Sequence, residues 1–305
     1  MKNKASPPHI IRSITEYSQV MGLPKPEHPL VMVYELDGDK GYPDLPDDKL
    51  INDFYCISIK RNLKGAIRYG RQYYDFSEGV MAFSAPRQVF EIDRTMDISG
   101  MTGWFLVFHP DLIRKYPLGK EIIAYGFFSY HVNEALHLSD KEENMVERIM
   151  QDIRAEYRQP IDAFTQNVIV SHIEVLLNYS NRFYKRQFIT RGNAADDLPG
   201  KFEMAIQNYF EQKNIAKLPT VNEFALQLNI SPHYLSDMLR SLTGQSAQQH
   251  IHNLLIEKAK EILLTTTLTI NETAYQLGFE YPPYFNRLFK NKTGLTPAAF
   301  RHSSQ

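Results

Sequence analysis

Thr220-Val-Asn-Glu-Phe-Ala-Leu-Gln-Leu228 recurs 49 residues later as Thr269-Ile-Asn-Glu-Thr-Ala-Tyr-Gln-Leu277. After one inserted residue the two copies match again, and the paired positions are Pro232 and Pro282, Tyr234 and Tyr284, Thr243 and Thr293, and Gly244 and Gly294. Self-similarity at a fixed period indicates one supersecondary unit that is used twice. The fold of the C-terminal third of the chain follows from this repeat.

Each copy of the repeat begins with the pattern of a capping box. Thr220 is followed three residues later by Glu223, and Thr269 is followed by Glu272. In such a box the hydroxyl accepts the backbone N–H of the third helical residue, and the carboxylate accepts the N–H of the cap itself. The pattern therefore predicts that a helix begins directly after Thr220 and another after Thr269.

The helix in each copy is predicted to end at Asn229 or Gly278, since both residue types tolerate the left-handed conformation of a helix C-terminus. A second helix follows after a short turn; in the first copy Ser231 caps it and Pro232 takes the first helical position. Two short helices joined by a tight turn form a helix-turn-helix, whose second helix can lie in the major groove of DNA. The alternative is a helical packing element without a role in DNA binding, and two matched units favour the DNA interpretation.

A helix over about Ala247 to Leu264 is predicted to join the two units. Its apolar residues lie along one side: Ile251, Leu254, Leu255, Ala259, Ile262 and Leu263. At ~1.5 Å per residue this helix spans roughly 25 Å. With the width of the units added, the two second helices would lie about 34 Å apart, which is one turn of B-DNA.

The second copy also carries a longer pattern: Gly278-Phe-Glu-Tyr-Pro-Pro-Tyr-Phe-Asn-Arg-Leu-Phe-Lys290, then Gly294-Leu-Thr-Pro297 and Phe300-Arg301. It resembles the signature of AraC/XylS-type bacterial transcription regulators, closely over the last hundred residues and more loosely over the rest. The resemblance implies that both second helices enter adjacent major grooves on one face of the DNA. It also implies a cupin-like barrel for effector binding in the N-terminal region and helices that mediate dimerisation.

The predicted DNA contacts are the residues off the apolar faces of the two recognition helices: His233, Ser236, Asp237 and Arg240 in the first, and Pro283, Asn286, Arg287 and Lys290 in the second. Arg287 can donate two hydrogen bonds to a guanine edge, and Asn286 can pair with adenine. Lys290 and Arg240 are expected to hold phosphate, which fixes register without reading sequence.

Three positions depart from the family pattern. Asp237 stands where the family often has a donor; it can accept from cytosine but repels phosphate. Pro283 has no donor at all, so the second recognition helix is expected to read fewer bases than is usual. Leu255 stands where the linker helix often has Arg, which removes one potential phosphate contact.

The length of 305 residues allows two domains. The chain has 34 basic and 35 acidic residues, and residues 201–305 hold ten Lys and Arg against eight Asp and Glu, a weak footprint for nucleic acid. The single cysteine, Cys56, cannot form an internal disulfide, which fits a reducing cytoplasm. The N-terminus does not read as a signal peptide, and no run approaches ~20 apolar residues, so neither export nor a membrane partner is predicted.

From about Leu30 the sequence is typical of short strands, separated by turn residues. The runs are Leu30–Leu36, Phe54–Lys60, Ala66–Phe76, Val80–Ile92 and Gly103–Phe108. Several short strands suggest a sandwich or barrel. The stretch Tyr73–Pro86 resembles the paired barrel strands of cupin-like sensor domains. The predicted fold class is α+β: a cupin-like β-barrel with a helical pair, followed by an all-α domain with two helix-turn-helix units.

The barrel is expected to bind a small-molecule effector, because ligand sites are largely apolar cavities with a few polar groups. Strand alternation puts Tyr69, Arg71 and Tyr73 on one face, with Ile67, and Arg68, Gln72 and Tyr74 on the other. Either face can line a barrel mouth. The candidate effector residues are those of the face that mixes aromatic and charged groups, together with an aromatic residue of the last strand: Tyr69, Arg71, Tyr73 and Trp104.

An enzyme is the alternative function, in the form of a cupin-type metalloenzyme with an appended helical domain. Metal-dependent cupins carry a His-x-His pair with a Glu and a further His, but these strands offer only His109. No phosphate loop, dinucleotide fingerprint or Gly-x-Ser-x-Gly is present either, so no cofactor and no metal are predicted. A third hypothesis is a regulator that has lost its effector and responds to expression level or to a protein partner.

Two helices are predicted between the barrel and the repeat, one from the capping pattern Ser139–Glu142 to about Arg158 and one from Pro160 to about Tyr184. They are expected either to cover the barrel or to mediate a homodimer. Residues 190–200 have loop composition and mark a linker between a domain at 1–189 and one at 201–305, whose helix-turn-helix units span about 220–243 and 269–292. The predicted partners are promoter DNA, a small effector and a second copy of the chain, with RNA polymerase as a further candidate.

Overall fold

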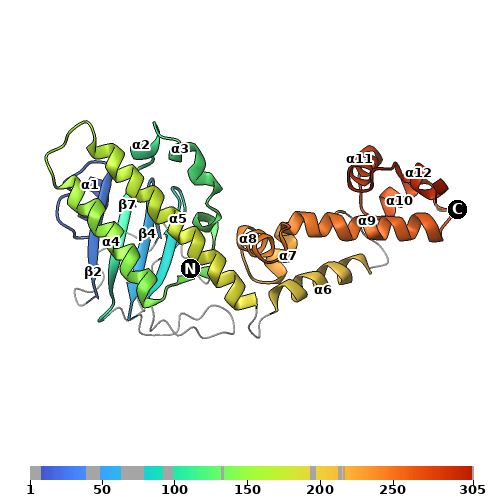
Figure 1. Cartoon of the computed structure of the whole chain (residues 1–305), viewed down its shortest axis with the longest axis horizontal. Coiled ribbons are helices and arrows are strands. Elements are labelled where there is room, and N and C mark those ends of the chain that lie inside the picture. Colours follow the sequence, from blue (N-terminus) through green and yellow to red (C-terminus); the bar gives the residue numbers. More distant parts are fainter. Residues whose placement is uncertain are drawn as a thin grey trace, which may run out of the picture. The chain divides into compact units, whose positions relative to one another are not determined.

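A computed structural model describes residues 8–38, 49–62, 79–91, 99–131, 134–192, 197–211, 215 and 217–303. The chain divides into two compact units, Met1–Gln187 and Phe188–Gln305, referred to below as the N-terminal and the C-terminal unit. Sheets and helices build the first unit, and helices build the second (Figure 1). The predicted strand Ala66–Phe76 lies outside the described residues.

In its described residues the N-terminal unit contains two sheets. The larger one has the strand order β2-β7-β4-β5-β8, and every described pair in it is antiparallel. Its strands are β2 (Val31–Asp37), β7 (Thr102–Phe108), β4 (Tyr55–Arg61), β5 (Val80–Ser84) and β8 (Leu136–His137). The smaller sheet consists of β1 (His9–Ile11), β3 (Lys49–Asn52) and β6 (Val89–Glu91).

The two faces of the larger sheet pack against different partners, because successive side chains of a strand point to opposite sides. On the inner face, Met32, Tyr34 and Val107 join one core cluster with Ile11 and Leu50 of the smaller sheet. The cluster also includes residues of α1 (Ile14–Val20). The two sheets therefore share a core, with α1 beside it.

Helices α4 (Asp140–Tyr157) and α5 (Thr165–Gly192) cover the outer face of the larger sheet (Figure 1). The hydroxyl of Tyr157 accepts from the N–H of Val33 at 3.1 Å and donates to its carbonyl at 3.2 Å. The guanidinium of Arg154 lies 4.5 Å from the ring centroid of Trp104. Between β7 and β8 the described residues include the short helices α2 (Pro110–Ile113), α3 (Leu118–Glu121), η2 (Ile122–Ala124) and η3 (Gly126–Ser129).

Several predicted elements differ from those in the structure. The run Val80–Ile92 forms two strands in different sheets, because the chain turns between them at Arg87, whose φ is 71°. Helix α4 buries Val146, Ile149 and Ile153 among its apolar residues, whereas Met145 is exposed. The short strands β1, β3 and β8 were not predicted, since two to four residues are too few for a periodic signal.

The C-terminal unit contains seven helices in its described part: α6 (Leu198–Phe210), α7 (Val221–Gln227), α8 (Pro232–Thr243), α9 (Ala247–Thr265), α10 (Ile270–Gln276), α11 (Pro282–Thr293) and α12 (Pro297–Ser303). We refer to α7–α8 as the first helix pair and to α10–α11 as the second. The predicted capping boxes of α7 and α10 are both present. The predicted left-handed residues Asn229 and Gly278 have φ values of 57° and 86°.

The boundary between the units also differs from the predicted linker 190–200. Helix α5 continues to Gly192, and α6 already begins at Leu198. Leu198-Pro-Gly200 reads as a loop by composition, but Asp197 caps α6 by accepting the N–H of Gly200 at 3.0 Å, with a proline in the first turn. Proline is tolerated there because that N–H has no partner within a helix.

The long helix α9 carries the core of the C-terminal unit. Its buried side chains are Ala247, Ile251, Leu255, Ile256, Ala259 and Leu263, and both helix pairs contact it. Leu255 is fully enclosed, so its apolar character serves the core. In the second pair, Phe285 and Phe289 are fully buried, and the Phe289 ring packs edge-on against Phe300 of α12. Within the described ranges, no helix is both long enough and apolar enough to cross a membrane.

We expect Thr269→Ala to lower the free energy of unfolding by about 1 kcal/mol, because the hydroxyl that accepts the N–H of Glu272 at 3.2 Å is lost. Urea denaturation followed by circular dichroism measures the change. Thr267→Ala is the matched control, because this threonine is exposed in the preceding turn. Equal stability of the two variants would contradict the assigned role of the cap.

Candidate nucleic-acid interface

The predicted contact residues of the first helix pair are those that α8 leaves outside the core. Helix α8 buries Tyr234, Leu235, Met238 and Leu239. His233 and Arg240 are exposed, whereas Ser236 and Asp237 are partly buried. On the outer side of α8, two of the four predicted contact residues are therefore exposed and two are partly exposed.

Asp237 forms an ion pair on this surface. Its Oδ1 lies 3.0 Å from Nη1 of Arg240, one helical turn away. The pair offsets the charge that the sequence analysis expected to repel phosphate, and it holds the Arg240 guanidinium close to the helix. A cation already paired with a carboxylate gains less from a phosphate, because part of its attraction is already satisfied.

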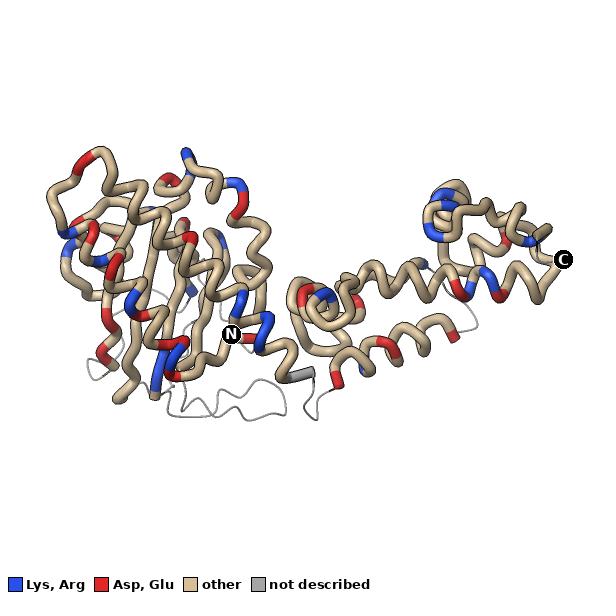
Figure 2. Tube along the Cα trace, in the orientation of Figure 1, with Lys and Arg blue, Asp and Glu red and all other residues tan. Residues whose placement is uncertain are grey.

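Helix α11 presents a different surface. Pro283, Arg287 and Lys290 are exposed, and the helix contains no acidic residue (Figure 2). The Arg287 guanidinium lies 5.6 Å from the ring centroid of Tyr284, which is 39% exposed. A cation over an aromatic face is attracted by the ring quadrupole. Tyr284 thus supports Arg287 from the same helix without neutralising its charge.

Asn286 is less open than the sequence analysis expected. It is partly buried, and its Oδ1 is enclosed without a hydrogen-bond partner in the described part of the chain. Pairing with adenine needs both the acceptor and the donor of the amide. A role for Asn286 in base recognition therefore requires its side chain to turn outward when DNA binds.

A chain of hydrogen bonds joins the ends of both helix pairs through α9. Lys292 Nζ donates to Asn253 Oδ1 at 2.9 Å, and Asn253 Nδ2 donates to Gln245 Oε1 at 2.7 Å. Arg301 Nε donates to the carbonyl of Leu263 at 2.9 Å, which ties α12 to the end of α9. Lys292 and Arg301 therefore bond groups inside the domain.

Lys217 connects the two helix pairs at a second point. Its Nζ lies 2.5 Å from Oε1 of Glu223 in the first capping box, and the Tyr209 hydroxyl donates to its carbonyl at 2.8 Å. The Lys217 bond and the N–H of Thr220 together lower the pKa of Glu223. The backbone of Lys217 packs against Gly278, where an added Cβ would lie 2.6 Å from the Lys217 carbonyl carbon. The segment before α7 thus fits into the turn of the second helix pair.

Residues 224–303 match the model of a family described as a helix-turn-helix domain. The chain carries an AraC-type helix-turn-helix domain. Its similar proteins include the uncharacterised HTH-type transcriptional regulator YfiF of Bacillus subtilis, at 30% identity over 151 residues, which cover 47% of this chain and 45% of YfiF. The HTH-type transcriptional activator RhaR of Salmonella schwarzengrund is 31% identical over 119 residues, which cover 36% of this chain and 40% of RhaR.

The first four relatives are matched over 44% to 64% of their own length, which is less than two thirds. Among solved structures, the C-terminal domain of the two-component response regulator YesN from Fusobacterium nucleatum is 35% identical. The match covers 32% of this chain and 96% of that domain, with a TM-score of 0.30.

Two structural features of the AraC-type domain were not predicted from the sequence. Tyr284 lies exposed beside Arg287, and Lys217 joins the helix pairs. The repeat marked Tyr284, because Tyr234 occupies the same position in the first copy. The repeat alone does not tell which of the two tyrosines is buried and which is exposed. Lys217 lies outside the repeat, so no pattern pointed to it.

Of the effector residues proposed from the sequence, Trp104 alone lies among the described residues. Tyr69, Arg71 and Tyr73 lie outside the described residues. Trp104 is buried on the outer face of the larger sheet, under Arg154 of α4. Trp104 therefore lies outside the space between the two sheets.

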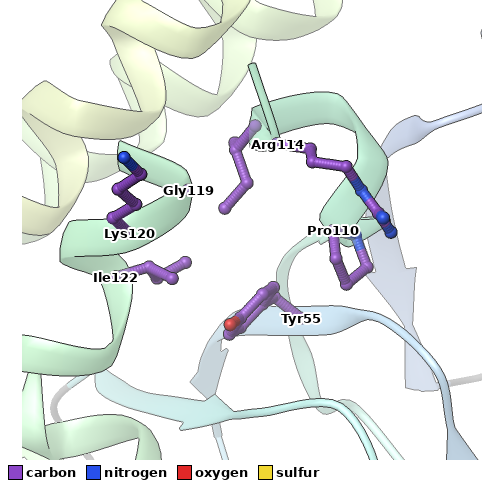
Figure 3. Close-up of a pocket in the computed structure, with 7 residues that line it drawn as sticks. Tyr55, Pro110, Arg114, Gly119, Lys120 and Ile122 are labelled. Atoms are coloured by element: carbon purple, nitrogen blue, oxygen red, sulfur yellow. The ribbon is translucent and has the colours of Figure 1, made fainter. Parts of the chain in front are cut away.

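One surface pocket of the N-terminal unit has a volume of about 370 Å³. It is lined by Tyr55, Pro110, Ile113, Arg114, Gly119, Lys120 and Ile122. The charged ends of Arg114 and Lys120 point in opposite directions (Figure 3), and Arg114 pairs with Asp111. The cationic groups of this pocket therefore do not converge on a common ligand position.

Gly278→Ala is expected to destabilise the AraC-type domain more than Gly294→Ala. Both glycines have positive φ, 86° and 80°, so both alanines pay about 1–2 kcal/mol for the left-handed conformation. Only position 278 adds a clash with the Lys217 backbone, since Gly294 has nothing within 4 Å. Urea denaturation of both variants measures the difference, and equal losses would disprove the close contact.

Proposed function

We propose that this chain is a cytoplasmic transcription regulator that binds promoter DNA sequence-specifically through both helix pairs and responds to a small-molecule effector. The observation that supports it best is the repetition of a complete helix-turn-helix geometry inside an AraC-type domain. Both pairs have a Thr–Glu capping box, a left-handed residue in the turn (Asn229 or Gly278) and a left-handed glycine at the end of the second helix.

In this proposal α8 and α11 are the recognition helices and enter successive major grooves. Helix α9 has 19 residues, so its axis spans roughly 28 Å. Arg287 reads a guanine edge, because its guanidinium is exposed and has no carboxylate partner among the described residues. Lys290 and Arg240 hold phosphate, and His233, Ser236, Asp237, Pro283 and Asn286 complete the two surfaces.

The N-terminal unit is proposed to close its two sheets into a cupin-like barrel with the effector between them. The shared core cluster supports this arrangement, because the inner faces of both sheets pack on it. The alternative of a metalloenzyme finds no support in YfiF or RhaR, which are named as a transcriptional regulator and a transcriptional activator. RNA polymerase is a partner in this proposal where the regulator activates transcription.

Genome-wide capture of bound DNA tests the proposal directly. The expected result is a small set of enriched sites with one shared sequence, spaced as two contacts one helical turn apart. The genes beside these sites would indicate the chemistry of the effector. Uniform recovery of DNA without a shared sequence would refute a sequence-specific regulator.

Arg287→Ala is expected to cost about 1–3 kcal/mol of specific DNA affinity and to relax selectivity at one base position. Lys290→Ala should instead weaken binding to all sequences alike and reduce the salt slope by about 1. Binding titrations at several fixed salt concentrations separate the two effects. Arg182→Ala, which removes an exposed arginine of the N-terminal unit, controls for net charge. Unchanged operator affinity of Arg287→Ala would remove Arg287 from the interface.

We further propose a homodimer formed through the outer side of α5. Phe164, directly before α5, and Val175 within it are exposed at 69% and 43%, although both are large and apolar. Residues eleven apart lie on nearly the same side of a helix, since three turns take about 10.8 residues. Val168 lies between them on this side and is partly exposed, and a contiguous exposed apolar patch marks an interaction surface.

Val175→Asp is expected to convert the dimer to a monomer, because a carboxylate would have to be buried in an apolar interface. Analytical ultracentrifugation of the full chain measures the mass. Asn181→Asp introduces the same charge at an exposed position on another side of α5 and should leave the dimer intact. A wild-type chain that sediments as a monomer would refute the dimer.

A further inference from the structure

Strand β4 ends with two cations on opposite faces of the larger sheet. Arg61 faces α4, where its guanidinium pairs with Glu143 and Glu147. Lys60, one residue earlier, points to the inner face, because side chains alternate along a strand. Arg61 on the outer face is therefore neutralised by two carboxylates, and the partners of Lys60 have to be sought on the inner face.

The strand register identifies the neighbours of Lys60 on the inner face. Lys60 stands opposite Gly103 of β7, which has no side chain, and diagonally next to Phe105. Its Nζ lies 5.7 Å from the Phe105 ring centroid. Phe105 in turn stacks on Tyr34 of β2, with centroids 5.0 Å apart and ring planes at 11°. Lys60 therefore lies at the end of an aromatic wall.

Polar groups without charge complete this surface. Cys56 and Ser58 precede Lys60 on the same face of β4, and the Tyr34 hydroxyl lies 2.6 Å from that of Tyr17. Burial raises the pKa of Cys56 to about 12, so the thiol stays neutral at physiological pH. These described groups of the inner face can donate and accept hydrogen bonds, but they carry no negative charge.

Across the described ranges, no carboxylate forms an ion pair with Lys60, and burial lowers its pKa. A partly buried cation that lacks a counter-ion is costly, since its lost hydration is not replaced. Stability alone would favour an apolar residue of similar length at this position. The unfavourable free energy of this unpaired cation is explained if Lys60 binds an anion from solution.

We infer that Lys60 receives the carboxylate of a small organic acid whose apolar body lies along Phe105 and Tyr34. This inference rests on the proposed effector site between the two sheets and names the chemical class of its ligand. A single ammonium beside an aromatic wall matches one negative charge joined to an apolar group. Inorganic phosphate is a poorer match, because it calls for several donors around its oxygens.

Thermal unfolding of the full chain tests the assignment with defined probes. Butyrate, benzoate and octanoate are compared with their neutral amides and with inorganic phosphate at constant ionic strength. A ligand that binds only the folded state raises the Tm by mass action. We expect the carboxylates to raise the Tm by about 2 °C more than the amides do, and phosphate to have no such effect.

Lys60→Met should abolish this preference and should raise the Tm of the ligand-free protein, because the unpaired cation is gone. Lys60→Arg keeps the charge and should retain a carboxylate preference, which distinguishes loss of charge from damage to the fold. Lys115→Met removes an exposed lysine of the same unit and should behave as the wild type.

Three outcomes would overturn the inference: equal shifts with acids and amides, a larger shift with phosphate, or a carboxylate preference that survives in Lys60→Met. Equal shifts that persist in Lys60→Met would leave a neutral effector in the barrel and keep the proposed function. The absence of any shift would also count against the effector part of that function. DNA capture reports on the DNA-binding part separately, because it does not depend on Lys60.

Discussion

The contact between the Lys217 backbone and Gly278 controls the geometry of the whole DNA-binding part. Each helix pair has its own caps, but two pairs on one long helix need a further contact to fix their relative position, which the proposed binding to successive grooves requires. Lys217 supplies it because its side chain bonds the capping box of the first pair while its backbone fills the space beside Gly278 in the second. A side chain at position 278 would separate these parts, so glycine is required both for its positive φ and for the close approach. The hydrogen bonds from Lys292 through Asn253 to Gln245 fix the pairs at a second point, and two fixed points resist rotation better than one.

The same scaffold presents two unequal surfaces. In α8 the cation Arg240 is engaged by Asp237, so a base or phosphate has to compete with an existing ion pair. In α11 the corresponding region has Arg287 on an exposed aromatic ring and no acidic residue. Attraction to DNA should therefore be stronger at the second pair, while the first pair contributes its preference through uncharged and acidic groups. The two surfaces differ because the copies of the repeat differ at these positions. The residues that the copies share form the caps, the turns and the core.

The repeat and its caps were predictable from the sequence because they are local. A capping box, a left-handed residue and a proline in the first turn each act within four residues, and all of them occur in the structure where the pattern indicated. Contacts between distant segments were not predictable. Nothing in the sequence near Lys217 indicates that its backbone meets position 278, and periodicity does not reveal that Trp104 lies under α4 while Lys60 faces the other sheet. The order of the five-stranded sheet likewise depends on pairings between residues tens of positions apart, such as β2 with β7.

The contacts of the Lys and Arg residues in 201–305 show how much of the small positive charge of this region is available to DNA. Lys217 bonds Glu223, Lys258 and Lys260 pair with acids on α9, and Lys292 and Arg301 bond groups inside the domain. Arg287 and Lys290 are then the cations of the helix pairs for which the described residues provide neither a hydrogen bond nor an ion pair. Non-specific affinity grows with the number of phosphates that a protein neutralises, so this domain should hold random DNA weakly and depend little on salt. Its selectivity would then come from base contacts at few positions, which suits a regulator that has to leave most of the genome unoccupied.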